Sequence, residues 1–229
     1  MEITRAYPDQ RGVRLLALDN GGTLGLSELL IVKEILNRVK INENLFAIPL
    51  PCDYFDLIGG VGTGGIIAIM LGRLKMPIDE AIKAYVELTK DVFSHKKPSR
   101  SSKVFKATRL ETKMKEIIQS VGLPPDVCMS ADEGPHCFTF VCATTCAKIS
   151  DPQLFRSYQV GANQNYNCTV WEAVRATTAA PEFFKSINIG NDPKEEFLGG
   201  SLGYSNPTKL LLDEAKDIFA LRHVACISG

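Results

Sequence analysis

The sequence predicts an α/β fold in which a mostly parallel central sheet is covered by helices on both faces. Short apolar runs typical of buried strands alternate along the chain with segments whose apolar residues recur at the helical period. Strands that alternate with helices pair in parallel, because each crossover returns the chain to the same end of the sheet. The 229 residues, 45% of them hydrophobic, suit one domain with a substantial core.

The amino-terminal part predicts two strand–helix units. Val13–Leu18 (VRLLAL) is an apolar run that leads into a glycine pair, which predicts a buried strand and a turn. Leu26–Lys40 follows with helical periodicity, and Asn42–Pro51 predicts a loop. Tyr54–Ile58 predicts the second strand, and Gly64–Leu74 predicts the second helix.

Leu57–Leu74 is the one stretch with the length of a membrane-spanning helix. It contains six glycines, five of them between residues 59 and 65, and glycine weakens a helix interior. A buried strand, a glycine-rich turn and a buried helix therefore explain this segment better than a membrane span.

The remaining elements continue the alternation: a helix at Asp79–Phe93, a basic exposed connection at Lys96–Lys106, a helix from Thr108 to Gly122, a loop at Pro124–Pro135, a strand within His136–Lys148, a helix at Thr169–Ala180 and a strand at Leu221–Ile227. Glu111 follows Thr108 by three residues, which predicts a capping box at the start of the helix from Thr108. Gly122 predicts its end.

Charge and cysteine content argue against several classes of protein. The 26 basic and 26 acidic residues cancel, which disfavours an electrostatic nucleic-acid binder. Seven cysteines are an odd number, and the polar start is unlike a signal peptide, so we expect reduced thiols in a cytoplasmic protein. Cys142 and Cys146 have CxxxC spacing, but with three histidines in the chain they make a weak zinc site; we expect no metal and no cofactor.

The segment FDLIGGVGTGGIIA, residues 55–68, carries the strongest functional signal. A strand, a sharp glycine turn and an apolar helix match the architecture of a nucleophile elbow, G-x-S-x-G. The five elbow positions are Gly60, Val61, Gly62, Thr63 and Gly64. The central position, where the motif has serine, is Gly62.

With three further blocks, the chain resembles the patatin-like phospholipase domain, of the fungal type. LALDNGGTLGLSELL resembles the family's oxyanion block D-G-G-G-x-R-G-L, and the elbow segment resembles F-D-L-I-x-G-T-S-T-G-G. WEAVRATTAAPEFF, residues 171–184, and FLGGSLGYSNPT, residues 197–208, resemble W-x-A-x-R-A-T-S-A-A-P-x-F-F and F-L-D-G-S-L-G-Y-N-N-P. The resemblance implies a three-layer α/β sandwich and extends from about Leu15 to the end.

The resemblance also implies a serine–aspartate dyad that hydrolyses lipid acyl esters. Carried over, the serine falls on Gly62 and the aspartate on Gly199, so neither catalytic side chain is present. The expected oxyanion-loop residues are Asn20, Gly21, Gly22 and Gly25, with Asn20 in place of a family glycine and Leu24 in place of the family's usual arginine. We expect Gly62 and Gly199 to lie within roughly 10 Å of each other, beside a small vacant space.

Other residues fit ordinary roles better than catalytic ones. Thr63 adjoins the elbow centre, and Ser201 and Ser205 lie in the last block, but none has an apparent base. Cys52, Asp19, Asp56, Arg175 and His223 are expected to be structural. The loop Asn20–Gly25 also resembles a phosphate-binding loop, but it lacks the first glycine of G-x-G-x-x-G and no G-K-[ST] follows. Nucleotide binding therefore ranks below the patatin-like interpretation.

Two functions remain open on the sequence alone. The first is a catalytically inactive patatin-like module with a lipid-binding, regulatory or scaffolding role. Its expected partners are a lipid or fatty acyl ligand and further domains or another protein. The second is an active lipid acyl-ester hydrolase. We expect residues 1–12 to be an amino-terminal extension and residues 13–229 to be the domain, truncated at its carboxyl end. We expect a cytoplasmic protein, peripheral to membranes, with no transmembrane segment and no nucleic-acid partner.

Overall fold

The computed structural model describes residues 12–94, 105–130, 137–159, 166–190, 193–201, 203–219 and 224–228, the last range as backbone only. Most of the expected amino-terminal extension and of the basic connection at 96–106 lies outside these residues, as do His136 and His223.

The central sheet has seven strands in the order β5-β6-β3-β2-β1-β7, with β4 also paired to β3. The strands β1 (Val13–Leu18), β2 (Leu57–Val61), β3 (Phe138–Thr145) and β7 (Val224–Ser228) run parallel. The strands β4 (Pro152–Arg156), β5 (Ile187–Ile189) and β6 (Glu195–Gly199) add antiparallel pairs next to β3. The α/β class and the parallel centre of the sheet are confirmed.

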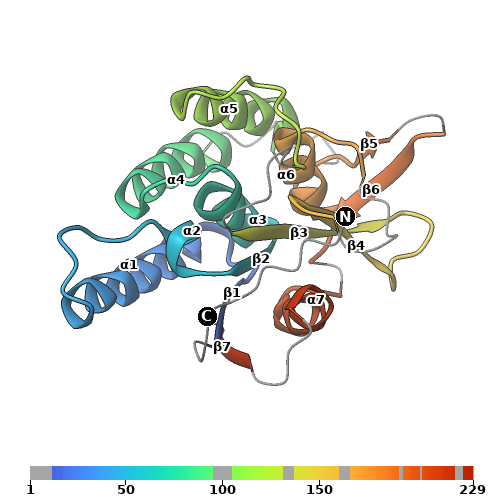
Figure 1. Ribbon diagram of the computed structural model, residues 1–229. Helices are drawn as coiled ribbons and strands as arrows, with labels where there is room; N and C mark the ends of the chain where they lie inside the picture. The colour runs from blue at the N-terminus through green and yellow to red at the C-terminus, as the bar shows by residue number, and fades with distance from the viewer. Residues whose placement is uncertain are drawn as a thin grey trace.

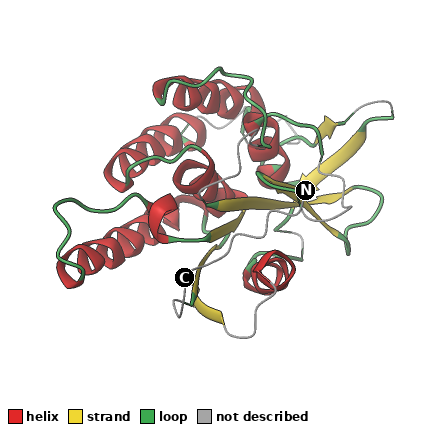
Figure 2. Ribbon diagram, in the orientation of Figure 1, coloured by secondary structure: helices red, strands yellow, loops and turns green. Residues whose placement is uncertain are grey.

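Helices cover both faces of this sheet (Figure 1). One face carries α1 (Gly25–Asn42), α3 (Gly62–Ala68) with its π-helical extension Ile69–Arg73, α4 (Ile78–Phe93), α5 (Ala107–Ser120) and α6 (Val170–Thr178). The helix α7 (Thr208–Phe219) covers the opposite face. Figure 2 shows the same layering by element type.

Alternate residues of β1 divide between two hydrophobic cores. Leu16 and Leu18 pack in the larger cluster under α1, α3 and α4, whereas Leu15 and Ala17 pack in the cluster that contains Leu211 of α7. Side chains of a strand point alternately to the two faces, so a strand buried on both faces reads as one apolar run. This is why the run VRLLAL predicts a buried strand.

The segment Leu57–Leu74 is a strand, a turn and a helix, as predicted, but the boundaries move. Pro51–Tyr54 forms the helical turn α2, so β2 begins at Leu57 and not at Tyr54. The strand continues through Gly59 and Gly60, and α3 begins at Gly62 and not at Gly64. Across the described residues, no helix has both the length and the apolar character needed to cross a membrane.

The capping box predicted at Thr108 and Glu111 is wrong. The helix α5 begins at Ala107 after Lys106, without a side-chain cap, and the Thr108 carbonyl accepts a bond from Thr112 inside the helix. A capping box does form at α6, between Thr169 and Glu172. The helix α5 ends at Ser120, and Gly122 closes it two residues later with a left-handed backbone, φ 81°, as predicted.

Candidate functional site

The elbow lies where β2 ends and α3 begins. Gly62 has a φ of 57°, the left-handed conformation of the central residue of a strained strand–helix turn. A side chain at Gly60 would place Cβ 2.7 Å from the carbonyl carbon of Gly64, and one at Gly64 would place it 2.5 Å from that of Leu18. The flanking glycines therefore let the helix pack directly on the strands.

Thr177 of α6 fixes the elbow from behind. Its Oγ1 accepts a hydrogen bond of 2.8 Å from the Gly62 N–H and donates one of 2.6 Å to the Cys142 carbonyl of β3. All three groups are buried, so these bonds satisfy polar atoms that water does not reach. Thr177 was not predicted as a site residue, although it stands in the RATT segment, residues 175–178.

The space beside Gly62 is filled, and the expected vacancy is wrong. A Cβ added to Gly62 would lie 2.6 Å from Asn20 Cγ and would overlap Asn20 Oδ1. That Oδ1 accepts a hydrogen bond of 3.3 Å from the Thr63 N–H. The Asn20 side chain thus occupies the volume that a side chain at position 62 would need.

Thr63 faces inward. Only 5% of Thr63 is exposed, and its Oγ1 accepts a hydrogen bond of 2.8 Å from the Gly22 N–H. The Tyr85 hydroxyl of α4 donates to the Gly22 carbonyl at 2.6 Å, which fixes the same loop from the other side. The Thr63 hydroxyl therefore holds the loop and is not presented to a substrate.

We call residues 20–25 the glycine loop. Its Gly21 N–H donates to the Asp19 carbonyl at 3.0 Å, and Gly22, with φ of 58°, donates to Thr63. Gly25 lies against Tyr85, and a Cβ there would be 3.0 Å from the ring carbon Cζ. Leu24 is 72% exposed. The N–H groups of Gly21 and Gly22 are thus bonded within the protein.

Gly199 is the last residue of β6, and the sheet register brings it to the elbow. Val61 pairs with Cys142, and Gly199 pairs with the next residue of β3, Ala143. Because β4 occupies the other edge of β3 at both positions, β2 and β6 share one edge and meet end to end. With about 3.8 Å between successive Cα atoms, this places Gly62 and Gly199 about 10 Å apart or closer.

The space beside Gly199 is also closed. A Cβ added there would lie 2.7 Å from the Ala180 nitrogen, just after α6, and the Gly199 N–H donates to the Ala179 carbonyl at 2.9 Å. The obstacle at Gly199 is backbone, whereas the obstacle at Gly62 is a flexible side chain. Aspartate is therefore harder to accommodate at position 199 than serine is at position 62.

The other residues singled out from the sequence lie in structural settings. Asp56 accepts a bond of 2.9 Å from the Arg14 N–H, and the carbonyl of Ser205 accepts one of 3.1 Å from the Asn20 N–H. Arg175 is 4% exposed and donates to the Lys185 carbonyl. Burial raises the pKa of Cys52 to about 11, which keeps it a thiol. Ser201 is half-buried.

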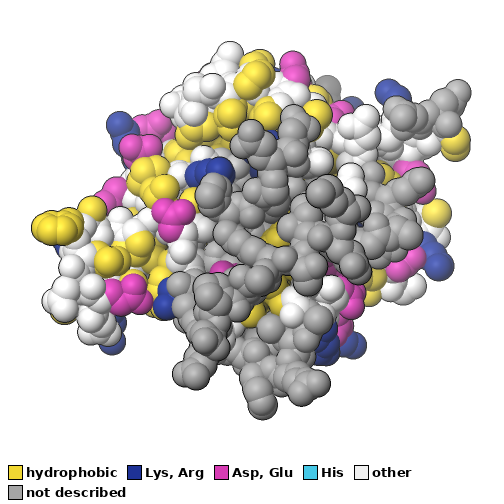
Figure 3. Space-filling view, in the orientation of Figure 1, with side chains coloured by type: hydrophobic (Ala, Val, Ile, Leu, Met, Phe, Trp, Pro, Cys, Tyr) yellow, Lys and Arg dark blue, Asp and Glu magenta, His cyan; other side chains and the backbone are white. Residues whose placement is uncertain are grey.

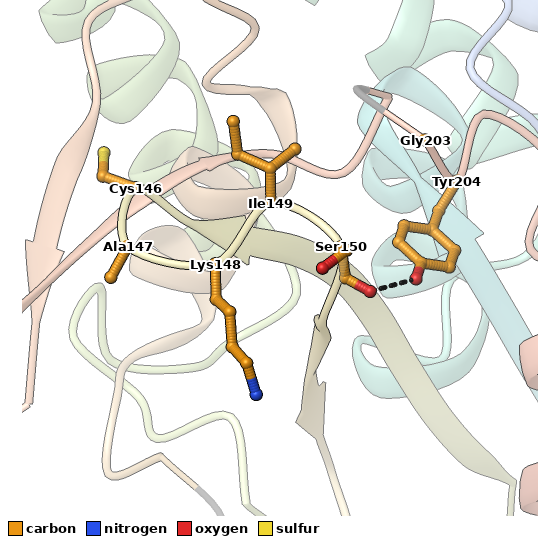
Figure 4. A pocket seen from close by; sticks show the side chains of 7 residues that line it. All are labelled: Cys146, Ala147, Lys148, Ile149, Ser150, Gly203 and Tyr204. Carbon is orange, nitrogen blue, oxygen red and sulfur yellow. Dashed lines mark hydrogen bonds between the residues drawn. The ribbon is translucent and has the colours of Figure 1, made fainter.

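An open hollow of about 690 Å³ lies beyond the end of β3 (Figure 4). Its lining comes from the β3–β4 turn and from the loop after β6: Cys146, Ala147, Lys148, Ile149, Ser150, Gly203 and Tyr204. The Tyr204 hydroxyl donates to the Ser150 carbonyl at 2.8 Å and joins the two segments. The carbonyl of the next residue, Ser205, accepts a hydrogen bond from the Asn20 N–H, which joins the loop after β6 to the glycine loop.

The chain matches a known family along most of its length. The sequence profile described as "Patatin-like phospholipase" matches residues 16–212, a range that contains the glycine loop, the elbow and Gly199.

The chain belongs to the patatin-like phospholipase family.

Relatives agree with this membership. "Calcium-independent phospholipase A2-gamma" of Rattus norvegicus is 31% identical over 95% of this chain and 28% of its own length. "Phospholipase A I" of Arabidopsis thaliana is 25% identical over 97% of this chain and 21% of its own length. "Probable inactive patatin-like protein 9" of Arabidopsis thaliana is 23% identical over 86% of this chain and 53% of its own length. The chain thus spans under a third of the first relative.

Proposed function

We propose that this patatin-like chain does not hydrolyse lipid esters and acts as a lipid-binding, regulatory or scaffolding module. The observation that carries the proposal is the pairing of Gly62 with Asn20 at the elbow. Position 62 offers no hydroxyl or thiol, and the Asn20 side chain occupies the place where a nucleophile would stand.

The chemistry of acyl transfer supports this choice. The reaction needs a nucleophile activated by a neighbouring base, and neither Gly62 nor Gly199 supplies one. Removing the nucleophile of a serine hydrolase costs on the order of 10⁶ in turnover. The internal bonding of Gly21 and Gly22 also leaves these N–H groups unavailable to an oxyanion in this conformation.

The finer features of the proposal follow the sequence. We take the ligand to be a lipid or fatty acyl group, since relatives are named phospholipases, and the chain to be of the fungal type. We place the protein in the cytoplasm, at membrane surfaces, with residues 13–229 as the domain. Further domains or a protein partner fit a chain that covers 28% of its first relative.

An active lipid acyl-ester hydrolase is the second candidate. It is favoured by the 31% identity over 95% of the chain with a protein named as a phospholipase A2. It requires a nucleophile other than residue 62, and the sequence offers Thr63, Ser201 and Ser205 for that role.

Ester release by a graded series of variants separates the two candidates. The series is the wild type, Gly62→Ser, Gly62→Ser/Gly199→Asp, and the same double variant with Asn20→Gly, assayed on a short activated ester and on phosphatidylcholine vesicles. We expect the wild type and the first two variants to remain at the rate of heat-denatured protein. Activity should first rise in the triple variant, because removal of the Asn20 side chain makes room for serine.

Two controls make the series decisive. The single variant Asn20→Gly shows whether a change in the glycine loop alone alters the rate of ester release. Urea unfolding of each variant measures the loss of stability expected because an aspartate side chain at position 199 meets the backbone at the end of α6. Wild-type turnover above the blank that a serine-directed reagent abolishes would contradict the proposal and favour the second candidate.

A further inference from the structure

The helix α1 carries apolar residues on two opposite faces. Its inner face is buried against the domain through Leu29, Val32, Leu36 and Val39. Among the described residues, eight large hydrophobic side chains are exposed, and six of them lie on or beside this helix: Leu24, Leu30, Ile31, Ile41, Leu45 and Phe46. Exposed hydrophobic side chains gather at the end of the molecule where α1 lies (Figure 1, Figure 3). The outer face of a surface helix is usually polar, so this face indicates a surface that another molecule covers.

The outer residues form one row along α1, which we call the outer row. It starts at Leu24 in the glycine loop and continues in alternating steps of three and four residues through exposed positions: Ser27, Ile31, Glu34, Arg38 and Ile41. This spacing keeps the row on one side of the helix, where a second helix can pack along it. The side chains of Glu34 and Arg38 are 59% and 74% exposed, so the middle of the row is uncovered within one copy.

The outer row is complementary to itself when it is turned end to end. Glu34 and Arg38 lie two positions before and after Leu36. Ile31 and Ile41 lie five positions before and after it. A two-fold axis at the level of Leu36 sets Glu34 against Arg38 of a second copy, and every contact of this kind occurs twice. In a parallel pair the like charges would face each other, so the charges favour antiparallel helices.

We propose that a second copy of this chain covers the outer row, with the two α1 helices antiparallel and crossing at the level of Leu36. Within one copy Arg38 donates a hydrogen bond of 2.8 Å to Glu34, and in the pair the same charges also attract across the interface. The antiparallel arrangement brings the residues that follow α1 in one copy beside Leu24 of the other. The second copy therefore covers part of the glycine loop. The inference does not depend on whether the chain hydrolyses esters.

The charges in the outer row favour a protein partner over a lipid surface. A helix that lies in a membrane interface keeps its charges on the polar face, which is rich in lysine and arginine. In α1 one acidic and one basic side chain, Glu34 and Arg38, stand in the middle of the apolar row. Contact with lipid tails would desolvate both charges, whereas a second copy gives each of them a partner of opposite charge.

The size of the face predicts a weak and reversible dimer. A single helix face buries less than the roughly 1,200–2,000 Å² of a standard interface, so we expect a dissociation constant on the order of 10 µM. Sedimentation velocity at protein concentrations from about 1 to about 200 µM covers this range. The wild type should change from monomer to dimer as the concentration rises.

Reversing the charges tests the arrangement of the helices. Glu34→Arg and Arg38→Glu should each weaken association by about tenfold or more, because each variant brings like charges together twice. An equimolar mixture of the two variants should associate as the wild type does, because each charge then faces its opposite. Glu116→Arg is the matched control, since it reverses an exposed charge that pairs with Lys113 on α5, and it should leave association unchanged.

A variant of the apolar part of the row completes the test. Ile31→Glu should also weaken association by about tenfold or more, since it puts a charge into the apolar contact. Because the altered positions are exposed, all variants should keep the urea midpoint of the wild type.

Four results would overturn the proposal. One is a wild type that remains a monomer over the whole concentration range. A second is a dimer that Ile31→Glu leaves intact, which would place the contact elsewhere. A third is unweakened Glu34→Arg and Arg38→Glu variants whose mixture associates more tightly than the wild type, which would indicate parallel helices. The fourth is a monomer that cosediments with phosphatidylcholine vesicles and loses this binding in Ile31→Glu, which would assign the face to a lipid surface.

Discussion

At the elbow, the Asn20 side chain fills the space beside Gly62 that a side chain at position 62 would need. A change at either residue therefore affects the packing of the other. Serine at position 62 needs the space of the Asn20 side chain, while glycine at position 20 would leave that space empty. Their combination explains how the turn keeps its left-handed backbone and its packing without a catalytic side chain.

At the residue scale, Thr177→Val should destabilise the fold by about 1–3 kcal/mol. The substitution keeps the shape but leaves the Gly62 N–H and the Cys142 carbonyl buried without their partner. Urea unfolding of Thr177→Val measures the effect. Thr178→Val is the matched control, because the neighbouring buried hydroxyl bonds back to Val174 of its own helix. Equal losses in the two variants would contradict a special role for Thr177.

The sequence showed where the elbow residues lie in the chain but not what surrounds them. The strand, the turn and the position of Gly62 follow from local glycine and apolar patterns. The filling of the space by Asn20 and the Thr177 bonds depend on contacts between segments distant in the chain. The sequence predicts Tyr85 only as an apolar position of the helix α4. Its hydrogen bond to the glycine loop cannot be predicted from the sequence, because a tyrosine that packs in the core and one that also bonds a loop occur in the same pattern.

At the element scale, α7 is fixed to the sheet by a buried ionic cluster. Arg156 of β4 donates two hydrogen bonds to Glu214, at 2.7 and 2.6 Å, and the Tyr158 hydroxyl donates a third at 2.8 Å. The Glu214 side chain is 8% exposed. This cluster joins the helix of one face to the strand that pairs with β3.

Glu214→Ala should therefore destabilise the domain by about 3 kcal/mol, because it leaves a buried guanidinium without its partner. Chemical unfolding measures the loss. Asp213→Asn, next to it on α7, removes an exposed charge that pairs with Lys216 and should cost under about 1 kcal/mol. A loss at Glu214 as small as that at Asp213 would show that the cluster does not fasten α7.

The strands β4, β5 and β6 and the helix α7 were not predicted from the sequence. The strand β5 has only three residues and β6 begins with two glutamates, so both lack the apolar run that revealed β1. For α7 a signal existed, since Leu211 and Ala215 recur at helical spacing. The apolar face of α7 is hard to recognise in the sequence because charged residues interrupt it, including Glu214, which is buried.

At the scale of the whole molecule, the site depends on backbone contacts more than on catalytic side chains. The glycine loop, the elbow, the end of α6 and the end of β6 converge where the strands β1, β2 and β6 end. Acidic and basic side chains are interspersed over the described part of the face in Figure 3, as the balanced composition suggests. These contacts pack the backbone closely around glycine at positions 62 and 199.

The most direct test of the account is covalent labelling of the wild-type chain with a fluorophosphonate, which reacts with activated serine and threonine hydroxyls. Intact mass is measured after incubation beside an active serine hydrolase in the same tube. The account predicts an unmodified mass for this protein while the reference enzyme is labelled. A stoichiometric adduct that maps to Thr63, Ser201 or Ser205 would contradict it.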